Sequence, residues 1–190
     1  PLTDYQWVSV EALQVQWLMG WFKLWFCHRD TILVKGGHEP EYFAATDTEP
    51  AKIVFAHGFF ASALHEISHW CMAGQKRRLL NDFGYWYAPD GRNEEQQQQF
   101  EQVEILPQAI ECLLTLACNK PFSVSKDNLF ADFDTSQSTF EADVQAQAVK
   151  FWQTGQKLST DAKVLLSQLT KLRPLPLTSF DISHNFIKVN

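Results

Sequence analysis

The chain has 190 residues, 45% of them hydrophobic and 14% aromatic, which suffices for one well-filled core and is short for two. We therefore expect a single domain over residues 1–190. With 22 acidic and 16 basic residues the net charge is -6, so a nucleic-acid backbone is not expected as the main partner. The four cysteines show neither CxxC spacing nor the density of a secreted disulfide scaffold, and we expect them to be reduced, buried thiols in the cytoplasm.

The first part of the chain predicts a helix followed by a small sheet. Apolar residues recur three and four positions apart from about Val8 to Cys27, which is typical of an amphipathic helix. Its expected buried face consists of Leu13, Trp17, Trp21, Leu24 and Trp25. The apolar part of this helix is too short to span a bilayer and includes Lys23, so no membrane partner is expected. Short runs rich in β-branched and aromatic residues predict strands at residues 31–35, 42–45 and 52–56.

The rest of the chain is expected to be mainly helical. Helices are predicted, in chain order, at about residues 60–80, 100–117, 139–152 and 161–172. Gly74 should be tolerated within the first of these, and Pro107 should kink the second or mark a restart. Ser159 and Thr160 are candidate caps, and the tail after Pro174 should be extended. The predicted fold class is therefore α+β, mostly helical, with a small β-sheet packed against the helix at 60–80 in a zincin-like layout.

That helix contains the most informative motif of the chain, His65-Glu66-Ile-Ser-His69. Residues four apart lie one above the other on a helix, so both imidazoles can face a single cation. Glu66 lies about 100° further round the helix, where its carboxylate can act on a metal-bound water as a catalytic base or hydrogen-bond acceptor. Apolar residues on the neighbouring face should bury the helix: Phe60, Leu64, Ile67 and Cys71.

A third protein ligand is expected from another element, because two histidines do not complete a metal site. Glu104 is the preferred candidate, since Val103 and Ile105 flank it with apolar side chains and should turn it inward. Glu101 is the alternative, either as a ligand or as a partner of a ligand histidine. The predicted buried stripe of this helix is Val103, Leu106, Ile110, Leu113 and Ala117.

Two histidines and a carboxylate support two kinds of chemistry. With Zn²⁺ they resemble a zincin-like metallopeptidase, in which Glu66 activates water against an amide carbonyl. With Fe²⁺ the same ligands leave positions open for O₂, and the expected reaction is oxygenation. The residues themselves leave this choice open.

Several blocks of the sequence resemble the bacterial elongation factor P hydroxylase family, in order and without gaps. The resemblance covers roughly residues 36–128, and its blocks are Phe55–Cys71, Asp82–Arg92, Phe100–Glu104 and Pro107–Ala109. It implies hydroxylation, in the cytoplasm, of the elongation factor P lysine that carries a β-lysyl group. It also implies a metal held by two histidines and a glutamate, which correspond to His65, His69 and, by the helix-facing argument, Glu104.

On this interpretation Fe²⁺ is the expected metal, O₂ the co-substrate and elongation factor P the protein partner of a monomeric enzyme. Nothing in the sequence resembles the His-x-Asp and distant His pattern of 2-oxoglutarate oxygenases. Glu66 would tune a bound water or relay protons. The segment Tyr85–Tyr87 and Arg92 are candidate walls of a substrate channel, and Lys76–Arg78 is a candidate docking surface.

Overall fold

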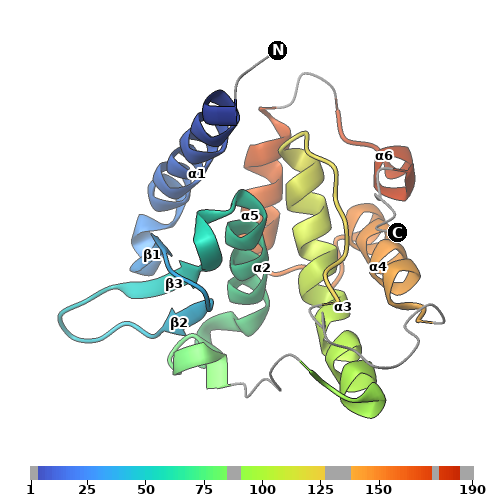
Figure 1. Cartoon of the computed structure of the whole chain (residues 1–190), viewed down its shortest axis with the longest axis horizontal. Coiled ribbons are helices and arrows are strands. Elements are labelled where there is room, and N and C mark those ends of the chain that lie inside the picture. The colour runs from blue at the N-terminus through green and yellow to red at the C-terminus, as the bar shows by residue number, and fades with distance from the viewer. Residues whose placement is uncertain (1–3, 85–90, 127–137, 173–175, 185–190) are drawn as a thin grey trace. The chain divides into compact units, whose positions relative to one another are not determined.

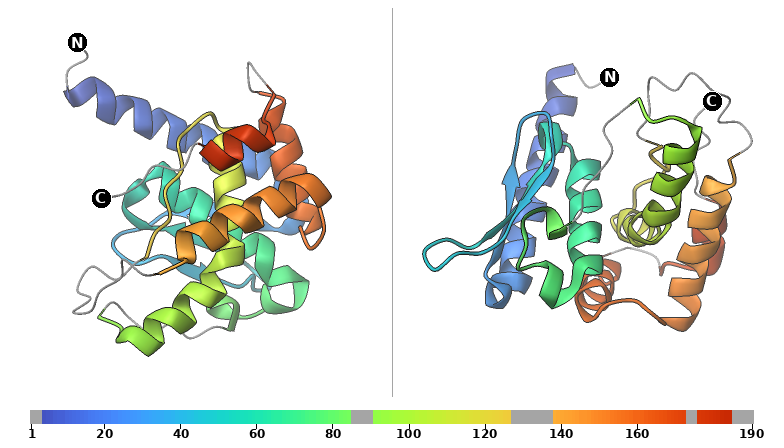
Figure 2. Two further views of the ribbon diagram at one scale, coloured as in Figure 1. Left: turned by 90° about the vertical axis from the view of Figure 1, so that its right-hand side faces the viewer. Right: turned by 90° about the horizontal axis from the view of Figure 1, so that it is seen from below.

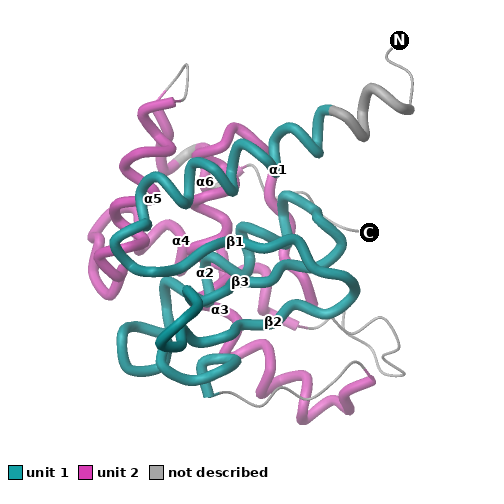
Figure 3. Tube along the Cα trace, turned by 90° about the vertical axis from the view of Figure 1, so that its left-hand side faces the viewer, with its two compact units in different colours: residues 1–85 teal, residues 86–190 magenta. Residues whose placement is uncertain are grey.

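The computed structural model describes residues 4–84, 91–126, 138–172 and 176–184. The chain divides into two compact units, Pro1–Tyr85 and Trp86–Asn190 (Figure 3). The expectation of a single domain is not tested by this division and stays a prediction. None of the helices in the described ranges is long and apolar enough to cross a membrane.

Unit 1 combines two long helices with a three-stranded sheet (Figure 1). Its elements are α1 (Asp4–Phe26), β1 (Thr31–Lys35), β2 (Glu41–Phe43), β3 (Ala51–Phe55) and α2 (Phe60–Arg77). β3 is the middle strand, parallel to β1 and antiparallel to β2. Alternate residues of β1 and β3 are buried, and α1 contacts β1 while α2 contacts β3 (Figure 2). The prediction of a small sheet packed against the helix that carries both histidines is confirmed.

The predicted helix α1 exists, but the predicted buried face was wrong. Among the α1 side chains that the structure describes, from Val10 on, the buried ones are Val15, Leu18, Phe22 and Phe26. Leu13 and Leu24, assigned to the core from their spacing, are 61% and 72% exposed. α1 is apolar on more than one side, so more than one stripe has helical spacing. The rings of Phe22 and Phe26 meet the buried ring of Trp70 edge-on, at centroid distances of 5.3 and 5.2 Å, and this packing selects the face.

α2 buries the face predicted for it, because Phe60, Leu64, Ile67 and Cys71 are all inside unit 1. The helix ends at Arg77 rather than Leu80. Its regular geometry is already interrupted at Gly74, whose φ of 66° and ψ of 173° lie outside the helical region. A glycine adopts such a positive φ without the steric penalty that a side chain would add.

Unit 2 is helical in the ranges described. Its helices are α3 (Glu94–Ala117), α4 (Phe140–Thr154), α5 (Thr160–Thr170) and α6 (Ser179–His184). α3 packs against α4 and α5 (Figure 2). The Ser159 hydroxyl accepts from the Ala162 backbone N–H and caps α5, as predicted, whereas Thr160 is already helical. α6 corrects the expectation of a wholly extended tail after Pro174.

α3 differs from its predicted form at its start, at its proline and on its buried face. It begins at Glu94, where Asn93 and Gln96 form a reciprocal capping box, and not at Phe100. Pro107 lies inside a continuous helix and marks no restart. Val103 is 60% exposed, so the predicted stripe was wrong at that position.

The cysteines are free thiols, as expected, but they are not all buried. Cys71 and Cys112 are buried, Cys118 is half-buried and Cys27 is exposed. Together the elements confirm a mostly helical α+β fold with a small sheet. The zincin-like layout stays a prediction.

Candidate metal centre

The sheet leads directly into the helix that bears both histidines. After β3, residues Ala56–Gly58 form a single 3-10 turn in which His57 has a φ of 54°. The Ser62 hydroxyl accepts from the Ala56 backbone N–H at 3.0 Å, across that turn. The carboxylate of Glu11 on α1 accepts from the backbone N–H of Phe60 at 3.1 Å. An acidic group at a helix N-terminus is stabilising. The first turn of α2 is therefore held both by the preceding 3-10 turn and by α1.

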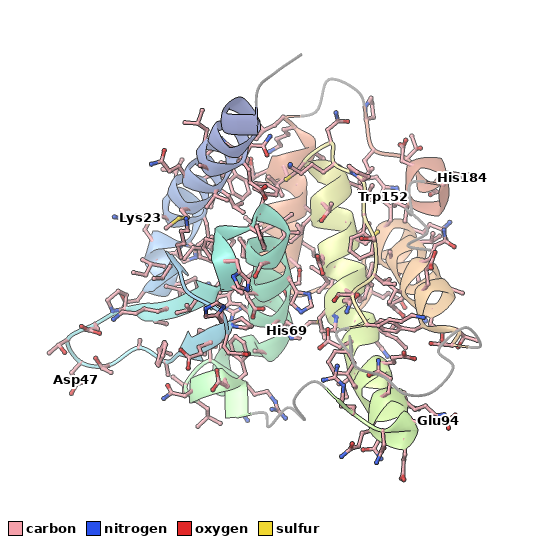
Figure 4. All side chains as sticks on the ribbon, viewed as in Figure 1. Lys23, Asp47, His69, Glu94, Trp152 and His184 are labelled. Carbon is pink, nitrogen blue, oxygen red and sulfur yellow. The ribbon has the colours of Figure 1, made fainter. Side chains whose placement is uncertain are left out.

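His65 and His69 lie one turn apart on α2 and direct the same ring atom toward one another. Figure 4 labels His69 on this helix. Their Nε2 atoms are 3.0 Å apart, and the rings are inclined at 72° with centroids 4.7 Å apart. Both side chains are half-buried. The structure therefore brings together the two histidines that the sequence singled out.

The spacing of these nitrogens fits two ligands of one ion. Metal–nitrogen bonds of about 2.1 Å with ligand angles of about 90–110° place the two nitrogens about 3.0–3.4 Å apart. The observed 3.0 Å falls in this range. It also fits a hydrogen bond between two neutral imidazoles, in which one ring donates and the other accepts.

Glu66 follows His65 on α2 and is half-buried. Its carboxylate is thus neither in the core nor fully in solvent, which suits a group that exchanges protons. Its catalytic role stays a prediction.

Glu104 lies on α3 in unit 2, and its side chain is only 2% exposed. The Gln108 side chain, one turn further along, donates from Nε2 to Glu104 Oε2 at 3.4 Å. The same amide exchanges two hydrogen bonds with the Ser125 backbone, from Nε2 to O at 2.8 Å and from N to Oε1 at 3.0 Å. A buried carboxylate needs such partners, since removing a charge from water costs several kcal/mol (about 2–7 even for a neutral polar group).

Glu101, the alternative ligand, is committed to other partners within unit 2. Its Oε1 accepts from Gln97 Nε2 at 3.2 Å, and its Oε2 accepts from the Ser138 hydroxyl at 2.6 Å. Ser138 in turn accepts from the backbone N–H of Phe140, where α4 begins. The carboxylate of Glu101 therefore ties α3 to the start of α4.

The candidate docking surface is largely engaged within unit 1. Arg77 donates to the backbone oxygen of Phe83 at 3.1 Å. Arg78 donates from Nε to the backbone oxygen of Trp70 at 2.9 Å, and its guanidinium lies 3.5 Å from the centroid of the Trp70 ring. Lys76 is exposed. Two of the three cations of this candidate docking surface therefore stabilise the end of α2.

Of the proposed channel walls, Tyr85–Tyr87 lie outside the described residues. Arg92 is buried in unit 2, where its guanidinium lies 3.9 Å from the centroid of the Phe100 ring and its Nε donates to Gln97 at 3.1 Å. It is thus a core group of unit 2. Sequence reasoning missed Gln108 and Glu11, and the available signal for Gln108 was its position four residues after Glu104 on one helix face.

Comparison with known proteins adds the family. A family model described as Elongation factor P hydroxylase matches residues 21–177 of the chain. The chain belongs to the elongation factor P hydroxylase family. The elongation factor P hydroxylase match includes both histidines and Glu104, and it leaves the first seventeen residues of α1 (residues 4–20) outside.

A relative from Haemophilus influenzae is named Elongation factor P lysine hydroxylase. It is 43% identical over 157 residues, which cover 81% of this chain and 88% of the relative. The family resemblance seen in the sequence is therefore confirmed. As a member of the elongation factor P hydroxylase family, the chain is expected to be an enzyme of the hydroxylase class.

Proposed function

We propose that this chain hydroxylates elongation factor P at the lysine that carries a β-lysyl group. The family match over most of the chain and the name of the Haemophilus influenzae relative support the substrate and the reaction type. The observation that carries a metal-dependent mechanism is the 3.0 Å separation of His65 Nε2 and His69 Nε2 on one face of α2. The cytoplasm, where translation takes place, is the proposed location.

His65, His69 and Glu104 are the proposed ligands, a donor set able to hold one metal ion. Glu104 is favoured over Glu101 because Glu101 already uses both carboxylate oxygens within unit 2. Glu104 is more deeply buried than its neighbours Val103 and Ile105 on α3, which is unusual for a glutamate without a structural or functional reason.

Fe²⁺ is the proposed metal. The two Nε2 atoms, 3.0 Å apart, are close enough to bind one ion, but this distance does not distinguish iron from zinc. Two histidines and one carboxylate are the ligand set of non-haem iron oxygenases, and the family match favours hydroxylation over peptide cleavage.

When bound, Fe²⁺ would supply the chemistry that activates O₂ for insertion of one oxygen atom into a lysine C–H bond. Reduction of the second oxygen atom to water consumes two electrons and two protons, so a two-electron reductant is required. The role of this chain is to hold the ion with three side chains and to deliver protons. Glu66 is the proposed proton carrier because it is half-buried beside His65.

The test is anaerobic reconstitution of the protein with Fe²⁺, followed by mass spectrometry of β-lysylated elongation factor P with a chemical reductant, with and without O₂. The expected result is an O₂-dependent gain of one oxygen atom on the modified lysine. His65→Ala and His69→Ala should abolish the gain, and His38→Ala, at an exposed histidine after β1, should retain it. Absence of the oxygen gain with fully iron-loaded protein would refute the proposal.

The zinc metallopeptidase is the alternative, with Glu66 as general base. The family match does not favour it. It predicts zinc-dependent cleavage of a peptide that is lost in Glu66→Gln, a result that the hydroxylase proposal does not allow.

A further inference from the structure

Unit 2 carries a line of polar side chains along one face of α3. They recur four, three and four positions apart, at Gln97, Glu101, Glu104 and Gln108. Gln97, Glu104 and Gln108 are buried, an arrangement that a helix tolerates only when each group has hydrogen-bond partners. Gln97 and Glu101 bond to one another, and so do Glu104 and Gln108.

The orientation of the Gln108 amide is determined by its neighbours. The backbone N–H of Ser125 can only donate, so the oxygen of the Gln108 amide must face it, at 3.0 Å. The amide NH₂ group then faces the Ser125 carbonyl oxygen at 2.8 Å and Glu104 Oε2 at 3.4 Å. An amide flipped by 180° would place two donors or two acceptors together and lose all three interactions.

The backbone that fixes Gln108 is itself anchored. Phe122, three residues before Ser125, is buried at 2% exposure. The next residue, Lys126, accepts through its backbone oxygen from Gln97 Nε2 at 3.0 Å. Two glutamines of α3 therefore hold the segment 125–126 against the helix, on either side of the turn that bears Glu101 and Glu104.

We propose that Gln108 is a positioning residue for Glu104, and this role rests on the proposed metal-binding function. Its NH₂ group donates to Oε2 at 3.4 Å and so restricts the rotation of the carboxylate, which favours one orientation of the Glu104 side chain toward the metal. The restricted orientation lowers the entropy cost of ordering the carboxylate when the ion binds. Residues that hydrogen-bond to metal ligands typically change metal affinity about 10–100-fold when they are replaced.

The test is a double-mutant cycle on metal affinity in the full chain. Gln108→Met removes the donor and nearly preserves the side-chain length. Zn²⁺ is the probe, and its affinity is measured by competition with a chromophoric chelator for the wild type, Gln108→Met, Glu104→Gln and the double variant. Gln102→Leu, at an exposed glutamine of the same helix, is the matched control.

We expect Gln108→Met to weaken Zn²⁺ binding about 10–100-fold in the wild-type background. In the Glu104→Gln background the same change should have almost no effect, since Gln108 acts only through Glu104. Equal losses in the two backgrounds would show a general structural role and overturn the inference. So would an unchanged affinity in Gln108→Met.

A second measurement, by NMR, follows the Gln108 side chain in the wild-type protein. In ¹⁵N-labelled wild-type protein, addition of Zn²⁺ should shift the side-chain amide resonances of Gln108 and leave those of Gln102 in place. Unshifted Gln108 resonances at saturating Zn²⁺ would contradict the positioning role. If the wild type binds no Zn²⁺ or Fe²⁺, or if Glu104→Gln binds metal as tightly as the wild type, the proposed ligand set itself fails. These results distinguish failure of the ligand set from failure of the positioning role of Gln108 alone.

Discussion

Arg78 stacks on Trp70 and hydrogen-bonds to the same residue, with its guanidinium 3.5 Å from the ring centroid and its Nε 2.9 Å from the Trp70 backbone oxygen. Trp70 is fully buried and directly follows His69. Phe22 and Phe26 of α1 also contact its ring, both edge-on. The turn of α2 that carries His69 is therefore followed by a buried ring, that of Trp70, which contacts both the Arg78 guanidinium and α1.

Replacing Arg78 should destabilise unit 1. Arg78→Met keeps much of the aliphatic packing but removes the stacked cation and the bond to Trp70, and the expected loss is about 1–3 kcal/mol. Lys76→Met, at an exposed position of the same turn, should stay within about 0.5 kcal/mol of wild type. Urea unfolding followed by tryptophan fluorescence measures both, and equal stabilities would contradict a supporting role for Arg78.

Substitutions of Glu101 and Glu104 should affect different properties, folding stability for Glu101 and metal affinity for Glu104. Glu101→Ala removes the acceptor of Gln97 and Ser138 and should cost about 1–3 kcal/mol of folding free energy while Zn²⁺ affinity stays near wild type. Glu104→Gln should lower Zn²⁺ affinity with a smaller effect on the stability of the metal-free protein. Chelator competition and urea unfolding on the same two variants check this, and loss of metal affinity in Glu101→Ala alone would make Glu101 the ligand.

The cysteines should differ widely in reactivity. Burial, together with the charge of Glu111, raises the pKa of the Cys112 thiol far above its usual range, so almost no thiolate forms there at neutral pH. Cys27 is exposed. Labelling with iodoacetamide at pH 8, followed by peptide mass spectrometry, should modify Cys27 at least ~100-fold faster than Cys112 in the folded protein. Comparable labelling rates of Cys27 and Cys112 without denaturant would mean that the structure around Cys112 on α3 opens readily.

Tyr42 should make the stability of unit 1 sensitive to alkaline pH. Burial raises the pKa of its phenol, only partly opposed by the charge of Arg78, and its hydroxyl donates to the Arg78 backbone oxygen at 2.9 Å. The folded state holds this proton more tightly than the unfolded state. The contribution of the protonated Tyr42 phenol to folding stability is therefore complete below the unfolded pKa of about 10 and decreases as pH rises above it.

The corresponding variant is Tyr42→Phe. It should lose about 1 kcal/mol at pH 7, where the hydrogen bond is intact in the wild type. The difference between the two proteins should shrink between pH 9 and about 11, as the wild type loses this contribution. Urea unfolding at several pH values measures the difference, and a difference that grows with pH would reverse the assigned sign.

The elements around the histidines could be predicted because their signals are local. A short run of β-branched and aromatic residues identified β3, and helical spacing identified the buried face of α2. The buried face of α1 could not be chosen in this way, since the ring of Trp70, some fifty residues away, decides which stripe is inside. The glutamine-rich start of α3 has no apolar residues at helical spacing, and only the capping pair Asn93 and Gln96 marks that end of the helix.

The sequence placed Glu104 inside the protein for a reason that does not hold. Val103, which was expected to turn it inward, is 60% exposed. Neighbours on a helix are about 100° apart, so an apolar residue next to a glutamate says little about the direction of the glutamate. The amide of Gln108 and the backbone of Ser125, which accompany the buried carboxylate, belong to a pairing across 17 residues that no local pattern contains.

β3 has a neighbouring strand on each side and passes through one short turn into α2. Amide protons of such a strand exchange with solvent only when the surrounding structure opens, so β3 should rank among the slowest-exchanging segments of unit 1. His65 and His69, the two proposed metal ligands on α2, follow this strand after one short turn. We therefore expect unit 1 to stay folded when no ion is bound, so that reloading the proposed site requires no refolding.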